Sequence, residues 1–402
     1  MGNFRTLYRY ELKKIINRKL FWISLALCLL CGGSSVFSCL IGKHYVDGKV
    51  YDTYYHMYQV DRQYYKALSG RAIDQTLLDE TMAGYRRIPR DAERYQLTEE
   101  YLTYARPYSE IFGWIGNNMR TNLYDTLDQE ITEESLASAR REMLEAVWSR
   151  DLLSEGEKAF WREKEGKLPN PVVYYDYFGY GQALEVLNTA GVLLPLILPI
   201  VLSGVFYEEH SRRTDQLTLS TRNGRRRLYW AKILAGITTA AGSALLLVLV
   251  TLGLCLGYYG TAGFQAPIQL FYPGYSYPLT MGQACLIAYG ILPVSAALAG
   301  AFVMVLSEFL RSRVAAMSVS VGLVIAGQVL IIPAGYRVLS QIWNCLPMNY
   351  SNVWNTFDWL LIPAPGGYMT SWQLVPVCYL LGAVLLALAG KWAYQRYQVS
   401  GR

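Results

Sequence analysis

The chain has 402 residues, of which 52% are hydrophobic, 14% aromatic and only 17% charged, with a net charge of +6. Because an ordinary soluble protein carries roughly 25% charged residues, this composition excludes a typical soluble enzyme, a disordered chain and a disulfide-rich secreted scaffold. A mean hydropathy of +0.15 is too low for a protein that lies wholly in the membrane. We therefore expect several membrane spans and one sizeable polar domain.

Residues 1–19 form the first expected element, a cytoplasmic amphipathic helix. Apolar residues recur at helical spacing and basic residues occupy the other side, so the helix should lie in the headgroup plane. A basic flank that only sets topology is the alternative interpretation. The residues assigned to the membrane interface are Phe4, Leu7, Tyr8, Leu12, Lys13, Lys14 and, from a later segment, Lys232.

Six stretches contain the roughly 20 mostly apolar residues that a helix needs to cross a bilayer. They are 20–42, 186–207, 230–258, 283–307, 314–334 and 372–394. The first is longer than the apolar core of a signal peptide, about 7–15 residues, so we expect it to stay as an anchor. The predicted fold class is an all-α polytopic membrane protein with six transmembrane helices.

Charge sets the orientation of these spans. The segments that would be cytoplasmic are 1–19, 208–229, 308–313 and 395–402. They hold far more Lys and Arg than Asp and Glu, whereas the outer loops 259–282 and 335–371 carry a single basic residue, Arg337. The positive-inside rule then places both termini in the cytoplasm, and we expect a multi-pass protein of the bacterial plasma membrane. Basic clusters beside apolar spans indicate anionic lipid as a partner, not nucleic acid.

Residues 43–185 form one polar domain outside the membrane, and their pattern is mainly helical. Thr132 begins one helical run, and Ser154 with Glu157 has the spacing of a capping box. Tyrosines gather at both ends, beside the membrane spans. They are Tyr45, Tyr51, Tyr54, Tyr55, Tyr58, Tyr64, Tyr65, Tyr174, Tyr175, Tyr177 and Tyr180. Anchoring at the interface and helix packing explain them better than binding of a carbohydrate or another ligand.

Signs of catalysis are lacking. The sequence has no Gly-x-x-x-x-Gly-Lys-Ser/Thr phosphate loop, and His44 with His56 is too weak a pair to predict a metal site. Cys28-x-x-Cys31 lies in an apolar span, where packing explains it. The span interiors hold essentially no ionisable residue, which argues against an ion-coupled carrier. We expect no catalytic residue, metal or other cofactor on this chain, and energy that comes from a partner.

The cytoplasmic loop 208–229 is suited to receive that energy. Glu208 and Glu209 stand where a short helix would begin, favourable for its dipole, and Leu217 and Leu219 offer an apolar contact. An ordinary basic loop is the alternative interpretation.

The order of these segments resembles the membrane subunit of ABC-2 type exporters. In that family the loop reads approximately Glu-x-x-x-Gly-Thr-x-x-x-Leu-x-x-(Ser/Thr)-Pro, then Arg and Lys before a span. The matching residues are Glu209, Thr214, Leu219, Thr221, Arg225 and Lys232. Arg213 replaces the usual glycine and Arg222 the usual proline.

The resemblance implies a dimer of two permease subunits, identical or different, each resting on a separate ATPase subunit that binds ATP. Residues 3–19 would be the elbow helix, and the last outer loop would be re-entrant. The residues assigned to coupling are Glu208, Glu209, Thr214, Leu217, Leu219 and Arg225, and those assigned to the re-entrant loop are Trp343, Leu346, Pro347, Trp354 and Trp359. A membrane sensor or immunity protein that binds a ligand through 43–185 is the alternative function.

Overall fold

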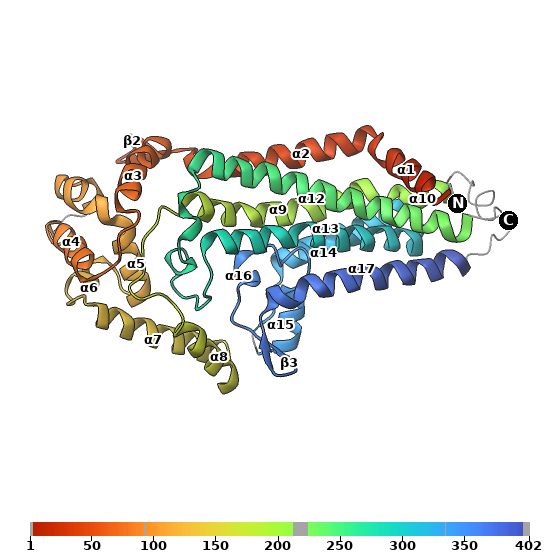
Figure 1. The fold of residues 1–402 in the computed structure, drawn as a ribbon. Coiled ribbons are helices and arrows are strands. Elements are labelled where there is room, and N and C mark those ends of the chain that lie inside the picture. The colour runs from red at the N-terminus through yellow and green to blue at the C-terminus, as the bar shows by residue number, and fades with distance from the viewer. Residues whose placement is uncertain (1–2, 92–93, 212–223, 334, 397–402) are drawn as a thin grey trace.

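The computed structural model describes residues 3–91, 94–211, 224–333 and 335–396. Over this part of the chain the protein is mostly helical and elongated, with a long helical bundle at one end and a smaller helical domain at the other (Figure 1). The bundle helices are α1 (Asn3–Ile16), α2 (Lys19–Val36), α9 (Phe178–Leu202), α10 (Gly204–Ser211), α12 (Tyr229–Tyr259), α13 (Met281–Leu310), α14 (Arg313–Val329) and α17 (Ser371–Arg396). Helix α1 and the last turns of α17 both lie at the end of the bundle farthest from the smaller domain.

Among the described residues, five helices are long and apolar enough to cross a membrane: α2, α9 with its continuation into α10, α12, α13 and α17. The sixth predicted span, 314–334, does not reach that length. Helix α14 has 17 residues and ends at Val329, which gives it about 26 Å against a hydrocarbon core of about 30 Å. Pro333 is one physical reason, because it has no N–H to donate to the carbonyl of Val329.

The other predicted spans keep their places but change their ends. The first helix stops at Val36, six residues before the expected end, and a short 3-10 helix follows at Ser38–Leu40. The second begins at Phe178 instead of 186. The helices expected at 230–258, 283–307 and 372–394 each extend by one to three residues at either end.

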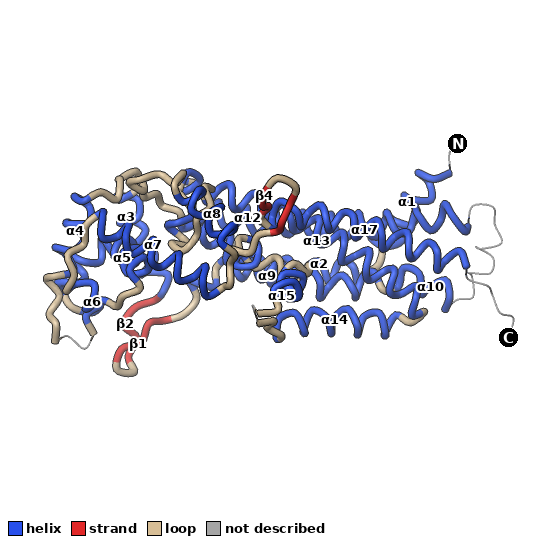
Figure 2. Tube along the Cα trace, turned by 90° about the horizontal axis from the view of Figure 1, so that it is seen from below, coloured by secondary structure: helices blue, strands red, loops and turns tan. Residues whose placement is uncertain are grey.

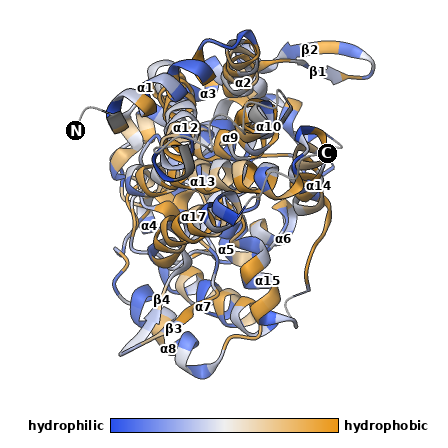
Figure 3. Ribbon diagram, turned by 90° about the vertical axis from the view of Figure 1, so that its right-hand side faces the viewer, coloured by the Kyte–Doolittle hydropathy of each residue, from blue (hydrophilic) through white to orange (hydrophobic). Residues whose placement is uncertain are grey.

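Helices α9 and α13 lie at the centre of the bundle. Helix α13 packs against α9, α12, α14 and α17, and α9 also contacts α2 and α12. Small residues permit close approach: a Cβ added at Gly300 of α13 would lie 2.8 Å from the Cβ of Ala240 on α12. The view along the length of the molecule shows hydrophobic residues over the bundle helices, as expected for a lipid-facing surface (Figure 3).

The smaller domain is built from helices around a hydrophobic core that includes Leu77, Ile111 and Trp148. Its elements are β1 (Lys43–Val46), β2 (Lys49–Thr53), α3 (Tyr54–Leu68), α4 (Gln75–Tyr85), α5 (Ser109–Met119), α6 (Leu123–Leu127), α7 (Glu133–Arg150) and α8 (Glu155–Glu165), with short turns of helix at Tyr95–Leu97, Tyr101–Ala105 and Arg106–Tyr108. The antiparallel β1–β2 hairpin projects from it (Figure 2). Both predicted helix starts are confirmed, since Thr132 and Ser154 each form a capping box.

Two irregular segments lie between this domain and the bundle. The first follows α12 and contains short 3-10 helices at Ala262–Gln265 and Ile268–Leu270. The second, residues 335–371, contains α15 (Arg337–Asn344), α16 (Val353–Thr356) and an antiparallel hairpin of β3 (Ile362–Ala364) and β4 (Gly367–Met369). Figure 1 shows α15, α16 and β3 beside the start of α17.

Candidate coupling site and outer pocket

The N-terminal helix α1 packs along the start of α12. The Tyr8 hydroxyl donates to Thr238 Oγ1 at 3.0 Å, while Ile15 is buried and Lys13 is exposed. Of the other residues assigned to the membrane interface, Phe4 is exposed, and Leu7, Leu12 and Lys14 are half-buried. One face of α1 therefore contacts protein.

A buried ion pair joins α1 to α12. Lys232 Nζ lies 3.1 Å from Glu11 Oε2 and 3.4 Å from the carbonyl oxygen of Val205. Lys232 is fully buried, and Glu11 is 4% exposed. The prediction that Lys232 meets lipid headgroups is therefore wrong. Its charge is compensated by a carboxylate inside the protein, as a buried ammonium requires.

A second ion pair joins the segment between α1 and α2 to α10. Arg18 Nη2 lies 2.9 Å from Glu208 Oε2, and Arg18 Nη1 donates to the carbonyl oxygen of Val201 at 3.5 Å. Gly204 lies beside this pair, and a Cβ there would be 3.4 Å from both Arg18 Nη1 and Glu208 Oε1.

The short helix that the sequence predicted to begin at Glu208 begins earlier in the structure, at Gly204. Glu208 and Glu209 are the fifth and sixth residues of α10 instead of its start. Helix α10 ends at Ser211, and Gly224–Leu228, which contains Arg225, forms a π-helical turn before α12. The remaining predicted coupling residues, Thr214, Leu217 and Leu219, lie outside the described residues.

Both flanks of residues 212–223 are thus held by the same N-terminal region. Glu208 precedes this stretch and pairs with Arg18, whereas Lys232 follows it and pairs with Glu11. A displacement of either flank along the bundle would break an ion pair or carry α1 with it. This arrangement can transmit a mechanical push.

At the other end, residues 345–351 reach deep into the bundle. Ser295 Oγ donates to the carbonyl oxygen of Pro347 at 3.4 Å, and a Cβ added at Gly191 would overlap the Cβ of Ser351. Gly191 and Ser295 lie near the middle of the 25-residue α9 and the 30-residue α13. The predicted residue Leu346 is half-buried beside Pro347, so this turn lies at mid-depth among the helices.

The three tryptophans of the same segment differ in their surroundings. The Trp343 indole N–H donates to the carbonyl oxygen of Leu330 at 3.0 Å. Trp354 is 55% exposed, with its ring centroid 4.0 Å from that of Tyr272. Trp359 is half-buried, and its carbonyl oxygen accepts a hydrogen bond of 2.9 Å from the buried indole of Trp161.

An ion pair joins the smaller domain to the 335–371 segment. The Glu157 carboxylate, buried on α8, pairs with the Arg337 guanidinium of α15. Burial raises the pKa of Glu157, but hydrogen bonds from Arg337 and Ser154 outweigh it and hold the pKa below its ordinary value. The smaller domain is therefore held to the segment that enters the bundle.

A family model described as "ABC-2 family transporter protein" matches residues 5–364. The chain belongs to this family. No curated protein sequence matches it. Membership supports a multi-pass membrane transport component without an ATPase domain of its own, of a kind that normally pairs with an ATPase subunit, and it does not favour the sensor alternative.

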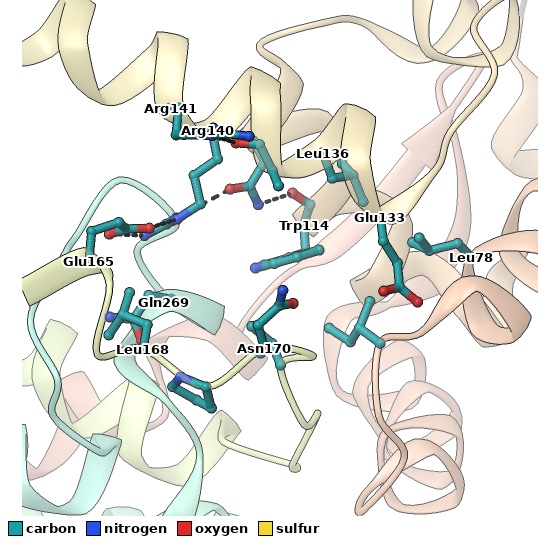
Figure 4. Close-up of a pocket in the computed structure, with 15 residues that line it drawn as sticks. Leu78, Trp114, Glu133, Leu136, Arg140, Arg141, Glu165, Leu168, Asn170 and Gln269 are labelled. Atoms are coloured by element: carbon teal, nitrogen blue, oxygen red, sulfur yellow. Dashed lines mark hydrogen bonds and ion pairs between the residues drawn. The ribbon is translucent and has the colours of Figure 1, made fainter. Parts of the chain in front are cut away.

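The smaller domain of this ABC-2 family protein, which we call the outer domain from here on, has a cavity of about 240 Å³ (Figure 4). Arg140 closes one side: its Nε lies 2.5 Å from Glu165 Oε1, and its guanidinium also donates to the carbonyl oxygens of Pro273 and Tyr275. Among the described residues, no group accepts a hydrogen bond from the buried indole N–H of Trp114 in the cavity wall. Sequence reasoning missed this cavity, because its lining comes from separate helices without a common motif.

Proposed function

We propose that this chain is the permease subunit of an ABC exporter. In this proposal two permease subunits form a translocation pathway, and separate ATPase subunits, which bind the ATP, drive it from the cytoplasm. The permease itself binds no cofactor and has no catalytic residue. The membrane is the bacterial plasma membrane, with both chain termini on its inner face.

The observation that carries this proposal is the double attachment of the loop flanks. The Glu208–Arg18 and Lys232–Glu11 pairs tie both sides of 212–223 to the N-terminal region. An ATPase that docks on this loop would therefore move α1 and the first turns of α12 together. In this mechanism 208–229 acts as the coupling helix and 3–19 as the elbow.

The contacts of the 335–371 segment support a re-entrant role. Its turn lies beside the middle of α9 and α13, while Trp359 and Arg337 hold it to the outer domain. Repacking of the central helices would therefore be transmitted to the outer domain. We propose that the segment dips into the outer leaflet, where neighbouring protein shields its backbone.

Affinity purification of the tagged chain from its native membrane tests the proposal. We expect a nucleotide-binding subunit to co-purify, and Glu209→Lys or Leu217→Asp to abolish ATP-dependent transport without preventing membrane insertion. Glu134→Lys, a matched charge reversal at an exposed position of the outer domain, should leave transport unchanged. Purification of the chain without any nucleotide-binding subunit, or normal transport by both loop variants, would refute the proposal.

A further inference from the structure

A second cavity, of about 190 Å³, lies where the outer domain meets the outer end of α9. The rings of Tyr65, Tyr174, Tyr177 and Phe271 line it together with the carboxylates of Glu110 and Glu185. No Lys, Arg or His of the described residues belongs to this lining. The cavity therefore combines aromatic rings and negative charge without an internal cation.

Glu110 is the half-buried carboxylate of this cavity, and its hydrogen-bond partners are neutral. The Tyr177 hydroxyl donates to Glu110 Oε2 at 3.0 Å, and Tyr65 also forms a hydrogen bond with the carboxylate. Burial raises the pKa of Glu110, these hydrogen bonds oppose the rise, and the nearby carboxylates of Asp61 and Asp176 add to it. A bound cation would offset both the burial and the repulsion.

The rings stand edge to face around the cavity. The ring centroids of Tyr174 and Tyr177 are 6.2 Å apart at 72°, and those of Tyr177 and Phe271 are 6.2 Å apart at 68°. Phe271 approaches α9 closely, because Gly181 has no side chain: a Cβ there would lie 3.1 Å from the Phe271 ring. Aromatic faces carry partial negative charge and attract cations at such sites.

We propose that this cavity binds the alkylammonium group of an organic cation. The ammonium would lie against the tyrosine and phenylalanine rings, with Glu110 at the bottom and the exposed Glu185 at the mouth. The volume is below the roughly 300 Å³ at which pockets for drug-sized ligands begin, so the site fits a cationic head group and leaves the rest of the ligand outside. Its place at the outer end of a membrane helix is compatible with a lipid head group or a soluble amine.

Binding of choline to the purified chain in maltoside micelles tests this site and does not depend on transport or on an ATPase. Isothermal titration should show saturable binding of one choline per chain. The uncharged isostere 3,3-dimethylbutan-1-ol should bind at least about tenfold more weakly, because it lacks the charge that the rings and carboxylates attract.

Substitutions measure the contributions of the carboxylates and of the aromatic rings to choline binding separately. Glu110→Gln should lower choline affinity at least about tenfold, because it removes the less exposed carboxylate that faces the bound charge. Glu185→Gln should lower it less, up to about fivefold, because an exposed charge is screened by solvent. Glu185 is exposed, so its substitution leaves the fold intact even if Glu110→Gln does not. Phe271→Leu should also weaken binding, whereas Glu134→Gln, an exposed position outside the lining, should bind choline like the natural chain.

Nanodiscs identify the source of the cation. Loss of choline binding in phosphatidylcholine nanodiscs, with retention in phosphatidylglycerol nanodiscs, supports a lipid head group as the occupant, and retention in both supports a soluble amine. Equal affinity for choline and its uncharged isostere, unchanged choline affinity in Glu185→Gln, or the absence of saturable choline binding in maltoside would overturn the proposal.

Discussion

Replacement of Lys232 by Met should destabilise the bundle strongly, because it leaves the Glu11 carboxylate buried without its main cation. Loss of one partner of a buried pair costs about 3–5 kcal/mol, compared with about 0–1 kcal/mol for an exposed pair. Lys232 is fully buried and the Glu11 side chain is 6% exposed, so the larger range applies. Because Lys14 Nζ also lies 4.0 Å from this carboxylate, we expect the lower end, about 3 kcal/mol.

A denaturant titration of the purified chain in maltoside micelles measures this free energy of unfolding. The double variant Glu11→Gln with Lys232→Met removes both charges and should recover about 2 kcal/mol of the loss caused by Lys232→Met alone. Lys167→Met is the matched control, since its ion pair with Glu163 is exposed and its loss should change stability by less than about 0.5 kcal/mol. A Lys232→Met chain as stable as the control, or a double variant no more stable than the single one, would refute this reasoning.

Three further predictions concern the outer end of the bundle. Trp161→Ala should cost about 3–5 kcal/mol, measured by the same titration, because it empties a fully buried site. Since the pKa of Glu157 is lowered in the fold, its pair with Arg337 stabilises the folded chain above the ordinary carboxyl value of 4.5. That contribution should disappear as the pH falls through the lowered pKa, detected as acid-dependent proteolysis of the outer domain. Gly191→Ala should weaken packing of the inserted turn and lower the thermal stability, whereas Gly242→Ala, with open space around its Cβ, should not.

A specific result would contradict each of these three predictions. Trp161→Phe keeps most of the volume and should lose much less stability than Trp161→Ala, and equal losses would show that the cavity is not the cause. Arg337→Met should reduce the acid dependence of proteolysis, and an unchanged pH profile in that variant would exclude a contribution from the Glu157 pair. Equal melting temperatures for the two glycine variants would show that close packing at Gly191 does not hold the turn.

The long spans could be predicted from the sequence because each depends on a local property, about 20 apolar residues in a row. The helices around 230–258, 283–307 and 372–394 follow that property almost to the residue. The helix starts at Thr132 and Ser154 could be predicted equally well, since a capping box is formed by residues three apart in the sequence. The early end of α14 at Val329 was harder to predict, because hydropathy alone does not register the missing N–H of Pro333.

The ion pair of Lys232 could not be predicted in the same way. A lysine at the start of an apolar span normally indicates the lipid headgroup region, and its partner Glu11 is 221 residues away in the sequence. Only the packing of α1 on α12 brings the two together. The tyrosines illustrate the same limit: composition favoured anchoring, whereas the fold gathers Tyr65, Tyr174 and Tyr177 around one cavity.

The distance between α1 and the loop flank, measured while ATP binds to a docked ATPase, tests the central claim most directly. Spin labels introduced as unnatural amino acids at the exposed positions Lys13, Arg227 and Trp392 allow two distances to be recorded by pulsed EPR in the native complex. We predict that the Lys13–Arg227 distance stays constant, because the ion pairs hold these parts together, while the Lys13–Trp392 distance changes on ATP binding. A Lys13–Trp392 distance that does not change on ATP binding, or a Lys13–Arg227 distance that does change, would contradict the account.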